Sequence, residues 1–250
     1  MANINFEGKS LLITGGSTGL GEGMVDAFDK AGARGVILDK AFPKNIRGNW
    51  HFIRCDLTNE KAVRDAFAAI PADFKPLDFL IANAGIVPSW SSIPEISLEV
   101  WDQVMAVNAR GLLLTLKYGF DLLRKSDGAV VVTASINSWK GDGNIVSYVA
   151  SKHAALGIVR SAALDFGKFG IRVNAIAPGP ITTSALISRI EERSANTQLS
   201  IDQELERLKA QTALGRLASI EDVANVALFL CSELSHGMTG QIINVDAGLL

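Results

Sequence analysis

Tyr148 and Lys152 lie four residues apart in the segment SYVASKHA. In a helix, residues at this spacing share one face, one turn apart. A free phenol has a pKa of about 10 and is a poor base near neutrality, but a nearby cation favours the phenolate and lowers that pKa. The pair can therefore provide a tyrosine general acid/base if its face points into a cleft. On spacing alone, a solvent-facing pair is the alternative.

Ser135 precedes Tyr148 by 13 residues and follows the apolar run GAVVVTA. Ligands of open α/β sheets bind outside the carboxyl ends of the strands, which is where this serine would stand. Its hydroxyl can hold a substrate oxygen beside Tyr148. The three side chains together predict proton transfer at an alcohol or a ketone, whereas Ser135 alone would also suit a strand-end turn.

The segment LLITGGSTGLGEG is a glycine-rich loop between an apolar run and a helical pattern. Gly15, Gly16, Gly19 and Gly21 permit a tight turn and a backbone bare enough for a pyrophosphate to approach. Free N–H groups at the start of the helix attract the anion. The spacing is G-x-x-x-G-x-G rather than G-x-G-x-x-G. We therefore predict a nucleotide site here, with the glycines of an ordinary turn as the alternative.

Asp39 ends the run GVILD, 18 residues after Gly21. A carboxylate at this place accepts hydrogen bonds from the adenosine ribose and repels a 2′-phosphate. The glycine loop carries Thr18 and no basic residue that would meet such a phosphate. These features favour NAD over NADP, although Lys40 keeps NADP as an alternative and Asp39 can also be a loop or capping residue.

Short β-rich runs alternate with longer helical patterns, as in proteins built from right-handed βαβ units. Most of the runs are continuously apolar, which is typical of a parallel sheet covered on both faces. We expect an α/β, Rossmann-like, doubly wound fold with about seven parallel strands in a single domain over 1–250. The expected strands are 10–14, 35–39, 50–55, 77–83, 128–134, 171–177 and 241–245, and the expected helices lie near 19–31, 60–69, 98–124, 147–168, 184–210 and 220–232.

Two connections stand out in this pattern. Only residues 40–49 separate the second and third strands, which is near the lower limit for a parallel crossover, so we expect an abbreviated helix or a plain loop. Residues 178–215 form a long polar stretch without strand character. We expect this stretch to act as a lid over the substrate.

Composition excludes several classes of protein. The chain has 250 residues, 48% of them hydrophobic, and a net charge of −2, so no nucleic-acid or membrane partner is expected. Cys55 and Cys231 match neither a disulfide framework nor a zinc site, and the three histidines show no metal-ligand spacing, so no metal is expected. The first residues lack a signal-peptide pattern, and the apolar runs are too short to span a bilayer. We expect a cytoplasmic location.

Further motifs extend the pattern along the whole chain. They are Asp56-Leu57 in RCDLTN, ANAG at 82–85, Asn108 in VMAVNARG, NAIAPGPITT at 174–183 and TGQIINVDAG at 239–248. In this order and spacing, with TGGSTGLG and the Ser135, Tyr148 and Lys152 set, the sequence resembles the short-chain dehydrogenase/reductase family. The one departure among these motifs is Ala82, where the family has an asparagine.

The resemblance implies a role for each motif. Lys152 would also bond the nicotinamide ribose, Asn108 would order a proton-relaying water, and Thr183 would bond the carboxamide. Two of these residues have a structural alternative. Asn108 can make a structural contact, and Thr183 can cap a helix. The catalytic set is then Asn108, Ser135, Tyr148 and Lys152. The implied cofactor-binding residues are Gly15, Ser17, Thr18, Gly19, Leu20, Gly21, Asp39, Lys40, Asp56, Leu57, Asn83, Ala84, Gly85, Tyr148, Lys152, Pro178, Gly179, Ile181 and Thr183.

The expected substrate residues are Trp90, Ser135, Asn137, Trp139, Ile145 and Tyr148, with the 184–212 segment facing them. Together with the cofactor motifs, these residues predict an NAD-dependent oxidoreductase that interconverts a hydrophobic or cyclic alcohol, diol or polyol with its ketone. One alternative is an NADPH-dependent carbonyl or 3-ketoacyl-thioester reductase, and another is a non-catalytic nucleotide sensor on the same fold. The resemblance also implies a homotetramer, or a homodimer, built on two-fold axes.

Overall fold

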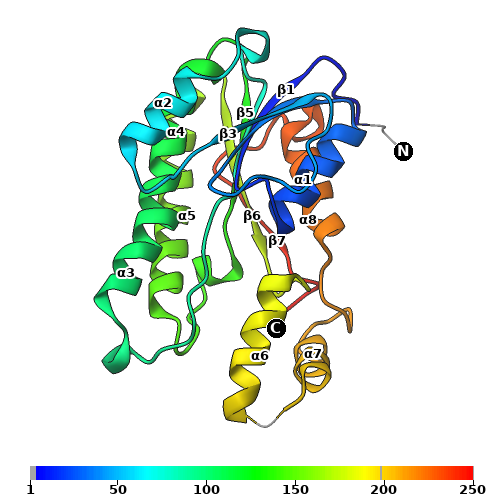
Figure 1. The fold of residues 1–250 in the computed structure, drawn as a ribbon. Helices are drawn as coiled ribbons and strands as arrows, with labels where there is room; N and C mark the ends of the chain where they lie inside the picture. Colours follow the sequence, from blue (N-terminus) through cyan, green and yellow to red (C-terminus); the bar gives the residue numbers. More distant parts are fainter. Residues whose placement is uncertain (1–3, 198, 250) are drawn as a thin grey trace.

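Seven parallel strands form one sheet in the computed structural model, which describes residues 4–197 and 199–249 (Figure 1). The strand order is β3-β2-β1-β4-β5-β6-β7, so the chain winds outward from β1 and then outward again from β4. The predicted doubly wound α/β fold is confirmed; the ends of the predicted domain, 1–3 and 250, lie outside the described residues. The strands are β1 (Ser10–Thr14), β2 (Arg34–Asp39), β3 (Trp50–Arg54), β4 (Phe79–Ala82), β5 (Ala129–Thr133), β6 (Arg172–Pro178) and β7 (Ile242–Val245).

Helices cover both faces of the sheet (Figure 1). One face carries α1 and α8, and the other carries α2, α4 and α5. The remaining helices are α3, which leads into α4, and the pair α6 and α7. The bounds are α1 (Gly19–Lys30), α2 (Glu60–Ala68), α3 (Leu98–Met105), α4 (Leu112–Leu123), α5 (Val146–Gly167), α6 (Ser184–Thr197), α7 (Ile201–Lys209) and α8 (Ile220–Cys231).

The strands are apolar along their whole length because successive side chains enter different cores. In β1, Leu12 packs in the cluster with α2, α4 and α5, whereas Leu11 and Ile13 pack in the cluster with α1 and α8. The same division recurs in β5, where Val130 and Val131 belong to opposite clusters. Two cores therefore hold the sheet rigid from both sides, and its carboxyl edge is a fixed platform.

The short connection between β2 and β3 is a plain loop. Residues 40–49, all described, contain no helix. The loop returns the chain through Trp50, whose ring covers Gly35 and whose Nε1 donates to Asp29 Oδ1 at 2.9 Å. The loop therefore brings β3 alongside β2 at the edge of the sheet without a crossover helix.

Two of the expected helices are interrupted. The range 98–124 holds α3, a π-helical turn at Ala106–Gly111, and α4. The range 184–210 holds α6 and α7, which lie together beyond the carboxyl edge of the sheet (Figure 1). Within the described part of the chain, no helix combines the length and apolar character that crossing a bilayer requires.

Candidate active site

A cavity of about 450 Å³ runs along the carboxyl ends of the central strands. The glycine loop borders one end, and the start of α6 borders the other. Nearly all of the predicted cofactor residues line this cavity. They are Gly15, Thr18, Gly19, Leu20, Gly21, Asp39, Lys40, Asp56, Leu57, Asn83, Ala84, Gly85, Tyr148, Lys152, Pro178, Gly179, Ile181 and Thr183.

The glycine loop leaves a bare backbone next to α1. Gly15 has φ +66°, and a Cβ there would lie 2.7 Å from Ala84 Cα, so the tight turn requires glycine. Gly19 has φ +59°, and a Cβ there would meet no protein atom within 4 Å although the residue lines the cavity. This open cradle at a helix N-terminus fits the pyrophosphate of a dinucleotide.

Ser17 is the exception among the predicted cofactor residues. Its side chain is buried, and its Oγ donates to the Ala41 carbonyl at 2.7 Å. Its N–H donates to Asp39 Oδ2 at 3.0 Å. Ser17 therefore lies outside the cavity lining and joins the glycine loop to the end of β2, which corrects the expectation of a direct cofactor contact.

Asp39 and Lys40 have different surroundings at the end of β2. The Asp39 carboxylate lines the cavity and accepts backbone N–H groups from Ser17 and Ala41 at 3.0 and 3.2 Å. Lys40 Nζ lies 3.1 Å from Asp56 Oδ2. Backbone hydrogen bonding from Thr58, helped by Lys40, lowers the pKa of Asp56. The charge of Lys40 is thus matched by Asp56, and the Asp39 carboxylate presents the uncompensated charge at this end of the cavity.

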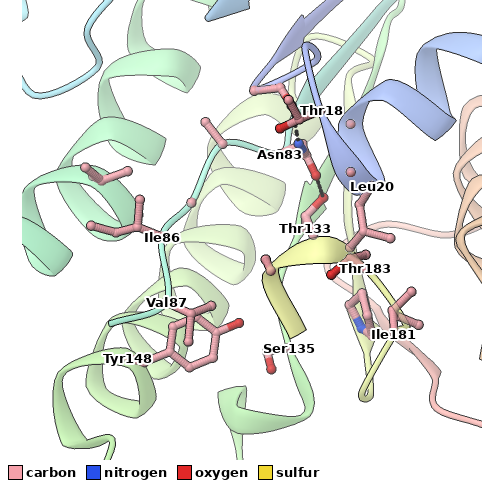
Figure 2. Close-up of a pocket in the computed structure, with 18 of the residues that line it drawn as sticks. Thr18, Leu20, Asn83, Ile86, Val87, Thr133, Ser135, Tyr148, Ile181 and Thr183 are labelled. Atoms are coloured by element: carbon pink, nitrogen blue, oxygen red, sulfur yellow. Dashed lines mark hydrogen bonds between the residues drawn. The ribbon is translucent and has the colours of Figure 1, made fainter. Parts of the chain in front are cut away.

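Asn83 joins the glycine loop to the catalytic end of the cavity (Figure 2). Its Nδ2 donates to the Gly15 carbonyl at 2.9 Å, and its Oδ1 accepts from Thr133 Oγ1 at 3.0 Å. The backbone carbonyl of Thr133 in turn accepts from Lys152 Nζ at 2.8 Å. Through these contacts, β4 and β5 fix the distance between the phosphate cradle and Lys152.

Tyr148 and Lys152 occupy one face of α5, and this face points into the cavity. Lys152 is 5% exposed, and its Nζ lies 5.6 Å from the centroid of the Tyr148 ring. Burial lowers the pKa of Lys152 to about 8. The predicted inward orientation of the pair is therefore what the fold produces, and the solvent-facing alternative does not apply.

The electrostatics of Tyr148 differ from the expectation. Burial raises the pKa of the phenol, while a hydrogen bond from Ser135 and the charge of Arg189 lower it. Lys152 is not among the groups that lower the pKa. Its ammonium donates to Thr133 and is itself destabilised by burial. The cation that lowers the pKa of Tyr148 in the protein alone is Arg189, and the effect of Lys152 on the phenol stays a prediction.

Ser135 stands where β5 gives way to a turn of 3₁₀ helix, Ile136–Ser138. Its Oγ accepts the Asn137 N–H at 3.2 Å, and its own N–H donates to Ser138 Oγ at 3.3 Å. This reciprocal capping fixes the serine with its hydroxyl beside Tyr148 (Figure 2). Ser135 therefore caps the strand-end turn and also lies beside the phenol of Tyr148.

Asn108 does not line the cavity. It lies in the π-helical turn, 3% exposed, and its Oδ1 accepts the Ile86 N–H at 2.8 Å. Its Nδ2 donates to the Ile86 carbonyl and to Ser151 Oγ at 2.9 and 3.0 Å. The side chain thus ties the segment after β4 to α5, one residue from Lys152. This arrangement gives Asn108 a positioning role through its side chain.

A second cavity of about 180 Å³ adjoins Tyr148 on the side of α6 and α7. Of the predicted substrate residues, Trp90, Ser135, Asn137, Ile145 and Tyr148 line it. Trp139 is 43% exposed and lies outside the lining of both cavities. Trp139 directly follows the 3₁₀ turn, which ends at Ser138, and the structure does not place it in the substrate cavity where sequence reasoning expected it.

Sequence reasoning also missed residues that line these cavities. Ile86 and Val87 follow ANAG directly, so their proximity to that motif was the available signal. The α6 and α7 residues were covered only by the general expectation of a lid, because no local motif marks which face of those helices turns inward. They are Leu186, Arg189, Ile190, Glu204 and Leu208.

Thr183 combines two contacts at the start of the lid. Its Oγ1 accepts the Leu186 N–H at 3.3 Å, so it caps α6, and the residue also lines the larger cavity. The capping alternative considered for this residue is present in the structure. It does not remove Thr183 from the lining of the larger cavity.

The glycine cradle, Asp39 and the Ser135–Tyr148–Lys152 cluster define the site of a nicotinamide-dependent oxidoreductase. Comparison with known proteins agrees with this class. The family model described as enoyl-(acyl carrier protein) reductase matches residues 15–250. Short-chain dehydrogenase reductase 3a of Arabidopsis thaliana is 36% identical over 259 residues, which cover 99% of this chain and 97% of the plant protein. The chain belongs to the short-chain dehydrogenase/reductase family, whose members act on CH–OH groups.

Solved structures show the same architecture. Aldohexose dehydrogenase of Thermoplasma acidophilum, in its ligand-free form, has a TM-score of 0.90 and 26% identity, covering 98% of this chain and 94% of its own. An NAD⁺-bound xylitol dehydrogenase has a TM-score of 0.89 and 25% identity, covering 97% of this chain and 99% of its own. Both neighbours support the fold and the predicted class of enzyme.

Proposed function

We propose that this protein is an NAD-dependent oxidoreductase that interconverts a secondary alcohol with its ketone. The observation that carries the proposal is the convergence of three side chains: Ser135 and Tyr148 line both cavities, and Lys152 lines the larger one. The bound nicotinamide would accept or supply the hydride, and the glycine loop with Asp39 would hold its adenosine and pyrophosphate. Hydrophobic or cyclic alcohols, diols and polyols are the substrate classes we expect, and the aldohexose and xylitol dehydrogenases act within that range.

The roles of the side chains follow from their contacts. Tyr148 takes the hydroxyl proton of the alcohol, and returns it to the oxygen in the reverse direction. Ser135 donates to the phenolate and orients the substrate oxygen, because its own hydroxyl is fixed by the 3₁₀ turn. Lys152, anchored on Thr133, lines the larger cavity and would bond the nicotinamide ribose. Asn108 holds α5 and the segment after β4 in register.

The preference for NAD rests on charge at the end of β2. A 2′-phosphate would meet the Asp39 carboxylate, and Lys40 is already paired with Asp56. An NADPH-dependent carbonyl or thioester reductase would need a cation at this place. Only Lys40 could provide one among the described cavity residues, and it would have to leave Asp56 to do so.

A homotetramer is part of the proposal. Leu113 on α4 and Leu164 on α5 are 53% and 76% exposed, and Phe169 after α5 is 47% exposed. Large apolar side chains on one pair of helices favour a two-fold contact with a second copy. Sedimentation of the purified protein would test this assembly.

The experiment that tests the function is a screen of secondary alcohols, diols and polyols with NAD⁺, followed by NADH absorbance. Titration of NAD⁺, NADH, NADP⁺ and NADPH would accompany it. The proposal expects turnover of at least one alcohol class and tighter binding of the NAD pair. Bound cofactor without turnover of any alcohol or ketone would favour the nucleotide-sensor alternative, and tighter NADPH binding would favour the reductase.

A further inference from the structure

Arg189 is the one cation of the described residues that line the smaller cavity. It lies on α6 and also borders the larger cavity, so it stands where the two meet beside Tyr148. Its Nε donates to the Ala185 carbonyl at 3.1 Å, one helical turn back. This bond directs the guanidinium along the helix and uses one of its five N–H donors.

The guanidinium is half-buried and forms no ion pair within 4 Å to a described residue. Burial lowers its pKa, and the charges of Tyr148, Glu192 and Asp142 raise it in that order. Glu192 and Asp142 are both exposed, and each has another contact: Glu192 accepts from Ser89 at 2.9 Å and Asp142 from Asn137 at 3.5 Å. A cation in this environment lacks the close anion that would compensate its desolvation.

The rest of the smaller cavity is mostly apolar. Its walls include Val87, Trp90, Ile145, Leu186, Ile190 and Leu208. The carboxylate of Glu204, which also lines the cavity, is bonded by Arg207 Nε at 2.6 Å and is held on α7. A ligand that fills about 180 Å³ here would find apolar walls, the Ser135–Tyr148 hydroxyls and one guanidinium. The other polar groups of the lining are the Asn137 amide and two carboxylates: Asp142, which accepts from Asn137, and Glu204, which accepts from Arg207.

We propose that Arg189 binds the carboxylate of the substrate, which is a short aliphatic hydroxy acid or the corresponding keto acid. The proposal rests on the oxidation of a secondary alcohol proposed above, and it replaces the neutral alcohol classes named there with an alcohol that carries a carboxylate. The planar guanidinium fork matches a carboxylate with two parallel hydrogen bonds. A phosphate dianion would call for more positive charge than a single arginine provides, and the small apolar cavity limits the alkyl chain.

The reaction leaves the carboxylate unchanged. The C–H bond of the carbinol breaks, and its electron pair passes with the hydrogen to NAD⁺ as hydride. The O–H proton passes to Tyr148, and the carbon–oxygen single bond becomes the ketone. Arg189 fixes the substrate carboxylate. The carbinol carbon is then held against Ser135 and Tyr148 at one distance from that carboxylate.

The test compares acids with their neutral esters. The probes are racemic 2-hydroxybutanoate, 3-hydroxybutanoate and 4-hydroxypentanoate, each with its methyl ester, at saturating NAD⁺. The variants are Arg189→Met, which keeps the length, and Arg189→Lys, which keeps the charge without the fork. Arg64→Met on α2, whose side chain is 58% exposed, is the matched control. Cofactor binding to each variant is measured by titration.

The expected result is that at least one acid exceeds its ester in kcat/KM. Arg189→Met should lower kcat/KM for that acid by about 10- to 100-fold, mainly through KM, as expected for a lost charge-assisted bond. The ester should lose a much smaller factor, Arg189→Lys should keep part of the acid activity, and Arg64→Met should match the unaltered protein.

Three results would overturn the proposal while leaving the proposed function intact. The first is an equal loss of kcat/KM for the acid and its ester, which would show that Arg189 acts only on Tyr148. The second is a matching loss of NAD⁺ affinity, which would show that Arg189 binds the cofactor. The third is oxidation of neutral alcohols with none of the acids oxidised. Failure of every alcohol and every acid with NAD⁺ would instead reject the proposed function and this inference with it.

Discussion

Lys152 Nζ lies 5.6 Å from the centroid of the Tyr148 ring and donates to the Thr133 carbonyl at 2.8 Å. The lysine is thus anchored to β5 rather than to the phenol. In the protein alone, burial therefore sets the pKa of both groups: it raises that of Tyr148 and lowers that of Lys152. The pair is held in place at the larger cavity, where we propose that the nicotinamide binds.

Lys152→Met should flatten the pH dependence of stability. The folded protein releases the Lys152 proton near pH 8, whereas the unfolded chain keeps it up to about 10.5. Between these values the unfolded state binds more protons, so this lysine makes stability rise with pH, by about 3 kcal/mol over the full window. Urea unfolding of both proteins from pH 7.5 to 10 measures the difference. Parallel curves would contradict the buried, depressed lysine.

Gly19→Ala should weaken NAD⁺ binding as well as stability. The alanine would need φ near +59°, at a cost of about 1 kcal/mol, and its methyl group would project toward the space for the pyrophosphate. Gly8→Ala is the matched control, because Gly8 has φ +78° and equally open surroundings but lies outside the cavity. Both variants should lose similar stability, and only Gly19→Ala should raise the Kd of NAD⁺. Equal Kd values would place the cofactor elsewhere.

Asp39→Asn should relax the choice of cofactor. The amide oxygen can still accept a backbone N–H at the end of β2, but the charge that repels a 2′-phosphate is gone. We expect the ratio of NADP⁺ to NAD⁺ affinity to rise by about tenfold, which corresponds to about 1.4 kcal/mol. Asp165→Asn, an exposed position on α5, controls for the change of net charge. An unchanged ratio would show that Asp39 only supports the glycine loop.

The parts of the site that sequence predicted are those fixed by local rules. The i,i+4 spacing placed Tyr148 and Lys152 on one face of α5, and the apolar run before Ser135 placed that residue at the end of β5. The glycine spacing likewise required a turn at Gly15, whose Cβ would strike Ala84. Each of these predictions depends on a few neighbouring residues, and tertiary packing did not override them.

The parts that sequence did not predict depend on tertiary contacts. Arg189 turns toward Tyr148 only because α6 packs over the carboxyl edge of the sheet, and no spacing within α6 reveals that face. Trp139, directly after the 3₁₀ turn, lies outside the lining of both cavities. The π-helical turn at Asn108 depends on bonds to Ile86 and Ser151, which are distant in sequence. Periodicity alone predicts one continuous helix near 98–124.

The central claim is that the Tyr148 hydroxyl moves the proton during hydride transfer to NAD⁺. The most direct test is Tyr148→Phe, assayed on the best alcohol from the screen, with cofactor Kd measured on the same preparation. The substitution removes one oxygen and keeps the ring that packs beside Lys152. The account predicts a loss of kcat of about 10²- to 10⁴-fold with NAD⁺ still bound at a similar Kd. Turnover close to that of the unaltered protein would contradict the assignment.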